Sequence, residues 1–503
     1  MSPDPTPVHR AAIANLGCKV NQAEMIAVER LLRARGVELV GARDAADLVV
    51  VNTCSVTSVA DQKSRHAVRR ARRVNPGARV LVTGCSVVVD PETLAAADPT
   101  AELFDNGSKD RLLAELAALL DLPDGARLPS LSGVEPAGPY PDTLYREAGA
   151  DGEDTAADGF ERDIDRTRVF VKIQDGCSFH CTYCVIPRAR GPERSVPLDA
   201  VLADVRTAVA AGHREVVLTG INAGTWAGDG CPAGGASAAA GVSATDGLSA
   251  LVRRILAETA VERIRLSSIE PQHVTLDLVE LWAGSGGRCL PHFHLPLQSG
   301  DDQVLRRMGR RYNTAAYAAI VTRLREAIPG VALHADLIAG FPGEDDASWA
   351  RTMAFLRSLD LAGVHVFRYS SRPGTPAARM VGQVHGRTKK ARAAEALALA
   401  IEARARFAAR QVGRELRVLF EQPLPDGRWL GRAENNVPVE SAADDRRSLE
   451  NAVGLVLAEA PDPTAADRVI GRLLAVDQPR VAAPWPPAPS NTPGRTLADL
   501  PRT

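Results

Sequence analysis

Three closely spaced cysteines are the residues of this chain best suited to metal chemistry. Cys177, Cys181 and Cys184 form a C-x-x-x-C-x-x-C motif directly after residues 169–174, which the apolar pattern predicts to be a strand. Three thiolates can hold three irons of a four-iron four-sulfur cluster and leave the fourth iron open to another ligand. Zinc, with His180 as a fourth ligand, is the alternative, but structural zinc favours four closed ligands and paired C-x-x-C units. We therefore expect an iron-sulfur cluster at this triplet.

Three other cysteines are far apart in the sequence but share one position relative to predicted strands. Cys18, Cys54 and Cys85 each lie one or two residues past a strand predicted at residues 11–16, 48–52 and 79–83. Parallel strands end on the same edge of a sheet, where open α/β folds place their ligands, so these thiols are expected to meet. Three independent buried thiols are the alternative. The shared placement favours a second cluster site.

Alternating strands and helices predict an N-terminal parallel α/β domain over residues 9–122. Residues 142–165 hold nine acidic side chains against two arginines, and they make residues 123–165 an acidic linker. Six further strands are predicted with helical stretches between them, at residues 169–174, 215–219, 263–267, 292–297, 331–338 and 363–369. Six βα units favour a partial barrel over residues 166–400.

The C-terminal part changes to short strands with turn residues. About five of them lie within residues 411–477 and predict a small β-barrel. The Ala/Gly/Ser-rich residues 230–247 are expected to be a surface insertion, and the Pro-rich residues 479–503 a disordered tail. The fold class is therefore a multidomain α/β protein with a parallel α/β domain, a partial (β/α)6 barrel and a small β-barrel.

Composition narrows the class of protein. A chain of 503 residues with 45% hydrophobic residues supports two or three cores, and its net charge of -1 says nothing about a polyanionic partner. Eight cysteines in a chain of this length point to metal ligation or packing rather than to a disulfide framework. Cys231 and Cys289 lack the placement of the other six, and we expect no role for them.

No segment approaches about 18 apolar residues, and residues 1–10 lack a secretion signal, so we expect a cytoplasmic protein without membrane contact.

The first cysteine loop and its surroundings resemble a known family. The segment Gly-Cys-Ser-Phe-His-Cys-Thr-Tyr-Cys at residues 176–184 resembles the radical S-adenosylmethionine superfamily. All six cysteines together resemble the methylthiotransferase family, over roughly residues 11–476. Further matching segments are Arg-Gly-Pro-Glu-Arg, Ser-Ser-Ile-Glu-Pro, His-Leu-Pro-Leu-Gln-Ser-Gly and Gly-Phe-Pro-Gly-Glu, at residues 190–194, 267–271, 294–300 and 340–344. Arg188 and Pro192 depart from the usual family pattern.

The resemblance implies two four-iron four-sulfur clusters and S-adenosylmethionine as cofactors. One S-adenosylmethionine supplies a methyl group, another supplies a 5′-deoxyadenosyl radical, and the product gains a methylthio group at an unactivated carbon. Cys177, Cys181 and Cys184 would hold the catalytic cluster, and the other three cysteines an auxiliary one. The cofactor itself is expected to meet Tyr183, Gly220, Ser268 and Glu270. The C-terminal barrel would be an RNA-binding TRAM domain, and an electron donor such as flavodoxin or ferredoxin is implied.

The loops around Cys18 and Cys54 look most like the family branch that acts on N6-threonylcarbamoyladenosine. The expected reaction is methylthiolation at C2 of that base, at position 37 beside the anticodon of tRNA. Methylthiolation of N6-isopentenyladenosine, methylthiolation of a ribosomal-protein side chain and a non-catalytic RNA-binding role are the alternatives.

Basic residues are the sequence evidence for an RNA partner. Lys63, Arg65, Arg69 and Arg70 lie on a predicted helix after the second cysteine, without an acidic residue between them. Residues 387–417 hold nine Lys or Arg against three acids. Two basic surfaces can supply phosphate contacts to the anticodon stem-loop. Arg188 and Arg194 are predicted to face a carboxylate-bearing modification. Four histidines within predicted barrel strands, at residues 292, 294, 334 and 365, are expected to be satisfied core or pocket residues without a metal or catalytic role.

Overall fold

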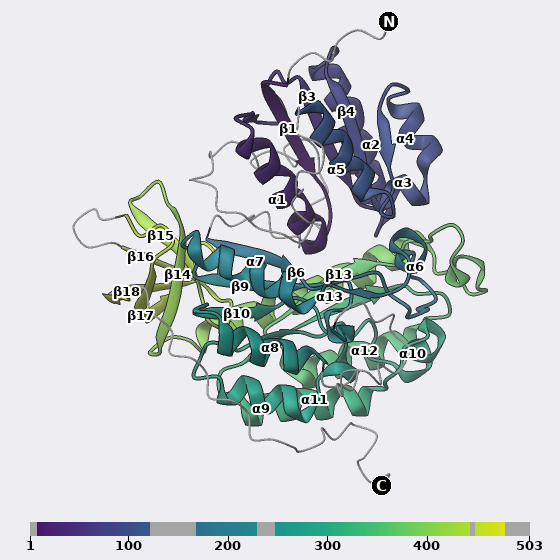
Figure 1. The fold of residues 1–503 in the computed structure, drawn as a ribbon. Coiled ribbons are helices and arrows are strands. Elements are labelled where there is room, and N and C mark those ends of the chain that lie inside the picture. The colour runs from purple at the N-terminus through teal and green to yellow at the C-terminus, as the bar shows by residue number, and fades with distance from the viewer. Residues whose placement is uncertain (1–7, 121–166, 229–246, 443–447, 478–503) are drawn as a thin grey trace, which may run out of the picture.

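The computed structural model describes residues 8–120, 167–228, 247–442 and 448–477. The predicted acidic linker and C-terminal tail, nearly all of the predicted insertion, and Cys231 lie outside these residues. The described chain forms an N-terminal sheet domain, a central open barrel and a small C-terminal barrel (Figure 1). The predicted fold class is confirmed. None of the helices in these ranges is long and apolar enough to cross a membrane.

The N-terminal sheet has five parallel strands in the order β2-β1-β3-β4-β5, and the first and last are short edge strands that the apolar pattern missed. Its strands are β1 (Arg10–Asn15), β2 (Glu38–Val40), β3 (Leu48–Thr53), β4 (Arg79–Gly84) and β5 (Glu102–Phe104). Its helices are α1 (Lys19–Ala34), α2 (Ser58–Val74), α3 (Cys85–Val89), α4 (Pro91–Ala97) and α5 (Lys109–Leu119).

Both faces of this sheet are buried, which explains the continuous apolar sequence of β3. Val50 packs into one core with α1 and α5, whereas Val49 and Val51 pack into the other with α2 and α4. The sheet therefore holds its strands rigidly, and the loops at their carboxyl ends carry the cysteines.

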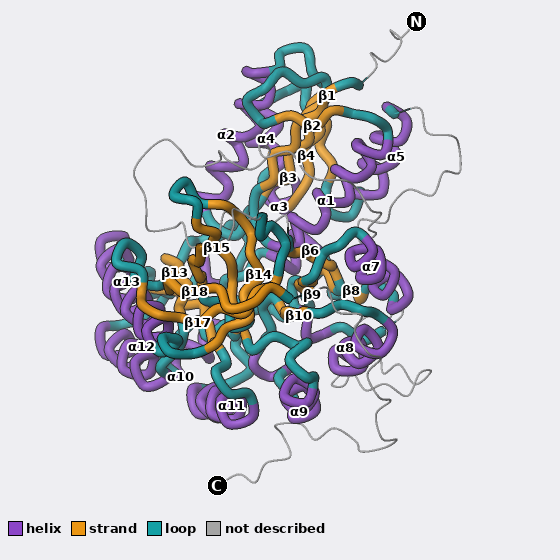
Figure 2. Tube along the Cα trace, turned by 90° about the vertical axis from the view of Figure 1, so that its left-hand side faces the viewer, coloured by secondary structure: helices purple, strands orange, loops and turns teal. Residues whose placement is uncertain are grey.

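Six parallel strands in sequence order form the central barrel. They lie in two three-stranded sheets, β10-β9-β6 and β11-β12-β13, which isolated parallel bridges join at Ile264–Cys289 and Ser268–His294. The strands are β6 (Arg168–Lys172), β9 (Glu215–Thr219), β10 (Arg263–Leu266), β11 (His292–His294), β12 (Ala332–Ala339) and β13 (Gly363–Arg368). Helices cover the outside as an arc (Figure 2), namely α7 (Leu198–Ala210), α8 (Gly247–Glu258), α9 (Leu276–Gly284), α11 (Thr314–Ala327), α12 (Asp346–Leu359) and α13 (Gly386–Ala409).

Short elements fill the loops at the carboxyl ends of these strands: β7 (Gln174–Asp175), β8 (Arg194–Ser195), α6 (Ile186–Arg190) and α10 (Asp302–Met308). The predicted strand at 292–297 ends early, at His294. Pro296 has no N–H to donate, so the continuous ladder is interrupted there. Pairing with β12 resumes at Gln298 as an isolated parallel bridge to Leu337, in which the Gln298 N–H donates to the Asp336 carbonyl at 2.7 Å.

The C-terminal strands close into a barrel in the order β14-β15-β16-β18-β17. They are β14 (Glu415–Pro423), β15 (Arg428–Ala433), β16 (Pro438–Ala442), β17 (Val453–Pro461) and β18 (Val469–Val476). Arg263 and Arg265 of β10 are buried, pair with Glu215 at 2.9 and 2.7 Å and donate to backbone carbonyls of the small barrel. The small barrel thus docks at the amino ends of β9 and β10, away from the first cysteine loop.

Candidate active site

The structure brings Cys18, Cys54 and Cys85 to one edge of the N-terminal sheet. Cys18 immediately precedes α1, Cys54 follows β3, and Cys85 opens α3. Their strands β1, β3 and β4 are neighbours in the sheet, so the three thiols share its carboxyl edge. Ser64 of α2 fastens the middle loop, because its hydroxyl accepts from the Cys54 N–H at 3.1 Å and donates to the Cys54 carbonyl at 3.0 Å.

Two glycines allow the cysteine loops to approach one another. Gly17 has a φ of +109°, and a Cβ there would lie 2.8 Å from Cys54 Cβ and 3.0 Å from its sulfur. Gly84 has a φ of +101°, and its Cβ would lie 2.3 Å from the Thr53 carbonyl oxygen. A larger residue at either position is strained and displaces a loop that carries a cysteine.

The radical-type triplet lies on a loop that several contacts fix. Thr182 donates its N–H to the Met308 carbonyl at 2.9 Å and its carbonyl accepts from Ala377 at 2.9 Å. Phe179 stacks on His273 at 5.8 Å, and the guanidinium of Arg311 lies 4.1 Å from the Phe179 ring centre. The loop is therefore held before any cofactor binds.

The chemistry of both triplets fits iron-sulfur clusters. All six cysteines are free thiols. Burial raises the pKa of Cys54 and of Cys184 to about 12, and that of Cys177 to about 11. Such thiols are protonated without a metal, and they lose their protons when an iron centre binds to the sulfur atoms. Cys18, Cys54 and Cys85 would hold one cluster, and Cys177, Cys181 and Cys184 the other.

Arg310 links the predicted cofactor residues to the cysteine loop. Its Nη1 lies 3.4 Å from both the Cys181 sulfur and the Tyr183 hydroxyl, and its Nη2 forms an ion pair with Glu270. Burial raises the pKa of Tyr183 well above its usual value, so the phenol stays protonated. No motif in the sequence marked Arg310, which lies far from the loop along the chain.

The other two predicted cofactor residues lie on neighbouring strands at the same end of the barrel. Gly220 directly follows β9 and packs on Gln174, whose Oε1 would lie 2.9 Å from an added Cβ. Ser268 lies just past β10 and forms a parallel bridge with His294 of the next strand. The structure thus gathers Tyr183, Gly220, Ser268 and Glu270 at the carboxyl ends of the strands, and their contact with cofactor stays a prediction.

The two cysteine sites adjoin across the interface between the domains. Asn106 donates to Cys85 Sγ at 3.8 Å and to the carbonyl of Ala189, five residues after Cys184, at 2.7 Å. Arg372 is buried and donates to Ser55 Oγ at 2.6 Å, next to Cys54. Figure 1 shows α3, which holds Cys85, directly over α6, which holds Ala189, and these two helices contact each other.

Arg188 lies in a pocket at this interface. It donates to the carbonyls of Val89 and Pro373 at 3.0 and 3.2 Å and so bridges the domains. The pocket measures about 190 Å³, and its lining includes Cys181, Cys184 and Arg188. A polar group in this pocket would therefore meet both the radical-type loop and a cation.

Five buried charges form a network beneath the auxiliary site. Arg190 pairs with Glu24 at 3.1 Å and with Asp175 at 2.8 Å, while Lys109 and Lys172 also pair with Glu24. Burial alone would raise the pKa of Glu24, but Arg190 and the two lysines hold it well below its usual value. Three cations thus face two carboxylates, and the surplus positive charge suits a site built from thiolates.

The predicted RNA-binding residues on α2 and at Arg194 differ in their exposure. Lys63 and Arg69 are exposed on α2, and Arg65 and Arg70 are partly buried beside them. Arg194 is half-exposed and lies 3.6 Å from the carboxylate of Asp175. Helical periodicity puts Lys63 and Arg70 on one flank of α2 and Arg65 and Arg69 on the other, on either side of the buried face of this helix, which begins just after the Cys54 loop.

Ion pairs partly neutralise the second basic stretch, residues 387–417. Five of its nine cations are held in ion pairs with acidic residues outside the stretch, namely Arg392, Arg404, Arg406, Arg410 and Arg417. The net charge of residues 387–417 therefore overstates their cationic surface, because five carboxylate-paired cations have partners elsewhere in the chain, and their contact with RNA stays a prediction.

Comparison with known proteins identifies the family. Residues 10–105 match the family described as "Uncharacterized protein family UPF0004", and residues 171–356 match the radical SAM superfamily. A Bacillus subtilis protein named threonylcarbamoyladenosine tRNA methylthiotransferase MtaB is 34% identical over 85% of this chain and 89% of its own. The chain belongs to the methylthiotransferase family of radical S-adenosylmethionine enzymes.

Other relatives of this methylthiotransferase carry two different names. A Thermotoga maritima relative with the same name as the Bacillus protein is 32% identical over 85% of this chain and 90% of its own. A Maricaulis maris relative, named tRNA-2-methylthio-N(6)-dimethylallyladenosine synthase, is 32% identical over 90% of this chain and 95% of its own. Among solved structures, the methyltransferase TsrM of Kitasatospora setae aligns with 73% of this chain and 77% of its own, at 17% identity and a TM-score of 0.48.

Proposed function

We propose that this methylthiotransferase modifies C2 of N6-threonylcarbamoyladenosine at position 37 of tRNA, giving 2-methylthio-N6-threonylcarbamoyladenosine. The observation that carries the proposal is the placement of two thiol triplets at one domain interface, where Asn106 contacts Cys85 of one triplet and Ala189, five residues past Cys184 of the other. Relatives named for this reaction are 30–34% identical over most of the chain. The dimethylallyladenosine reaction is the alternative, because relatives with that name are 32% identical.

The chain contributes ligation, orientation and the exclusion of water. When bound, the two clusters and two molecules of S-adenosylmethionine supply a carbon-centred radical and a methylated sulfur. Tyr183, Gly220, Ser268 and Glu270 would contact S-adenosylmethionine, and Arg310 orients Glu270 and Tyr183 at the loop. No acid-base pair is required, since a radical opens the C–H bond.

The RNA would approach along the basic residues of α2. Lys63, Arg65, Arg69 and Arg70 can bind phosphates of the anticodon stem-loop without reading its sequence. Arg188 in the interface pocket, or Arg194 nearby, would bind the threonyl carboxylate of the modified base. Flavodoxin or ferredoxin would supply electrons, and we infer a cytoplasmic location from the tRNA substrate.

Nucleoside mass spectrometry of tRNA tests the substrate. Cells lacking this gene should lose 2-methylthio-N6-threonylcarbamoyladenosine and accumulate the precursor without the methylthio group. Wild-type and Cys289→Ala proteins should restore the product, because Cys289 is buried outside both sites, whereas Cys181→Ala should not. Loss of only the dimethylallyl product would establish the alternative reaction.

A further inference from the structure

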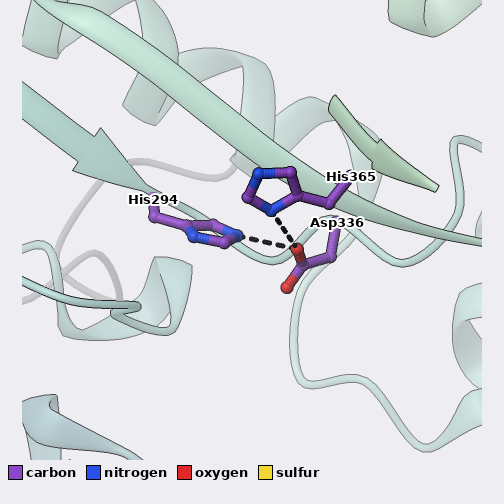
Figure 3. Close-up of side chains that lie close together, drawn as sticks. All are labelled: His294, Asp336 and His365. Carbon is purple, nitrogen blue, oxygen red and sulfur yellow. Dashed lines mark hydrogen bonds and ion pairs between the residues drawn. The ribbon is translucent and has the colours of Figure 1, made fainter. Parts of the chain in front are cut away.

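A cluster of two histidines and an aspartate lies inside the barrel, apart from both cysteine sites. His294 ends β11, Asp336 lies in the middle of β12, and His365 lies on β13, so three neighbouring parallel strands carry them. Asp336 Oδ1 lies 2.8 Å from His294 Nε2 and 3.3 Å from His365 Nδ1 (Figure 3). One donor atom from each residue lies within 4.8 Å of the other two.

Strand alternation sets the direction of these side chains. In β12, Leu333, Ala335 and Leu337 pack into the core against the surrounding helices, so Asp336 faces the opposite side, the barrel interior. His365 is in register with Asp336, and the strand pairing holds both. Donors on paired strands are positioned more rigidly than donors on loops.

We propose that His294, Asp336 and His365 bind one divalent first-row transition-metal ion. Two imidazoles and one carboxylate on one face are a donor set that binds such ions and leaves coordination positions open. The side chains are 12%, 17% and 33% exposed, so they are shielded from bulk water yet reachable from the interior. Without an ion, each histidine must direct a proton at the same carboxylate oxygen, and the ion replaces those protons.

Ser268, one of the predicted cofactor residues, forms a parallel bridge with His294 and so lies beside this site. Water or an oxygen atom of a bound ligand can complete the coordination of the ion. Its nitrogen and oxygen donors distinguish this site chemically from the iron-sulfur sites, whose donors are sulfur.

The test uses the holoprotein with both clusters reconstituted anaerobically and loosely bound metal removed by a chelator. Titration with Co²⁺ should give one bound ion per chain, with d–d absorption and no thiolate-to-cobalt charge-transfer band. Asp336→Asn preserves side-chain volume and should weaken binding by more than the about 10–100-fold typical of losing an outer-shell partner. His365→Gln should act likewise, and His66→Ala, an exposed histidine on α2, should bind Co²⁺ as the wild type does.

An iron content of about eight in each variant establishes that the fold and clusters are intact. The proposal would be overturned if the wild type bound no stoichiometric Co²⁺ or showed a thiolate charge-transfer band. It would also be overturned if Asp336→Asn and His365→Gln bound Co²⁺ as tightly as the wild type. Because no tRNA is present, these outcomes are independent of the proposed substrate.

Discussion

Replacing Arg190 with methionine should change both the stability of the domain interface and the potential of the auxiliary cluster. Arg190 is buried and carries the surplus positive charge of the five-residue network. Asn21 Oδ1 accepts a hydrogen bond from Arg190 and lies 3.7 Å from Cys18 Sγ. The guanidinium therefore lies close enough to the cluster ligands for its charge to affect them.

The structure sets the expected size of both effects. The bridge through Asn21 puts the guanidinium within about 6 Å of Cys18 Sγ, where a unit charge contributes about 3 kcal/mol at an effective dielectric constant of about 20. For one electron this corresponds to on the order of 100 mV. Losing the cation disfavours the reduced, more negative cluster, so the midpoint potential should fall by that amount. Breaking the buried pair costs about 3–5 kcal/mol, and the remaining lysines keep the cost at the lower end.

The assay is a redox titration followed by electron paramagnetic resonance. It is made in protein whose Cys177, Cys181 and Cys184 are alanine, so that only the auxiliary cluster is present. Arg190→Lys keeps the charge and should recover most of the potential, and Arg188→Met is the matched control, since Arg188 is exposed and bonded only to carbonyls. An unchanged potential in Arg190→Met, or an equal shift in Arg188→Met, would refute the reasoning.

Three further predictions concern a cysteine loop, a buried carboxylate and the basic residues of α2. Gly17→Ala should lose the auxiliary cluster, leaving about four irons of about eight, whereas Gly36→Ala, also at positive φ but with open space around its Cβ, should keep both clusters; iron analysis decides. Burial would raise the pKa of Glu215, but Arg265 and Arg263 lower it to about 2, so its contribution to stability is full above about pH 4.5 and is lost as pH falls towards 2. Glu215→Gln should therefore unfold at a lower temperature than the wild type at neutral pH. Circular dichroism melts should show the difference in melting temperature shrinking as pH falls from about 4.5 towards 2, and a difference independent of pH would contradict the low pKa of Glu215. Lys63→Ala with Arg69→Ala should weaken tRNA binding and reduce the slope of log affinity against log salt by about 1 to 2, and an unchanged slope in a filter-binding assay removes α2 from the RNA surface.

The amino-acid pattern alone predicts the fold class and the sheet edge where the auxiliary cysteines meet. Hydrophobic periodicity is local, so it reports strands and helices, and the parallel arrangement then places the ends of neighbouring strands together. Cys18, Cys54 and Cys85 each follow a strand, and this alone predicts that they converge. Short edge strands such as β2 were not predicted, because three residues are too few to show a hydrophobic period.

Which distant side chains meet depends on the three-dimensional packing of the elements. The pairing of Arg190 with Glu24 and the contact of Asn106 with Cys85 join residues whose separation along the chain carries no signal. The cations of residues 387–417 look like an RNA surface in sequence, yet carboxylates distant in the chain form ion pairs with five of the nine. His294 and Asp336 alternate with apolar residues as any barrel strand does, and register between strands, which sequence periodicity does not encode, brings them together.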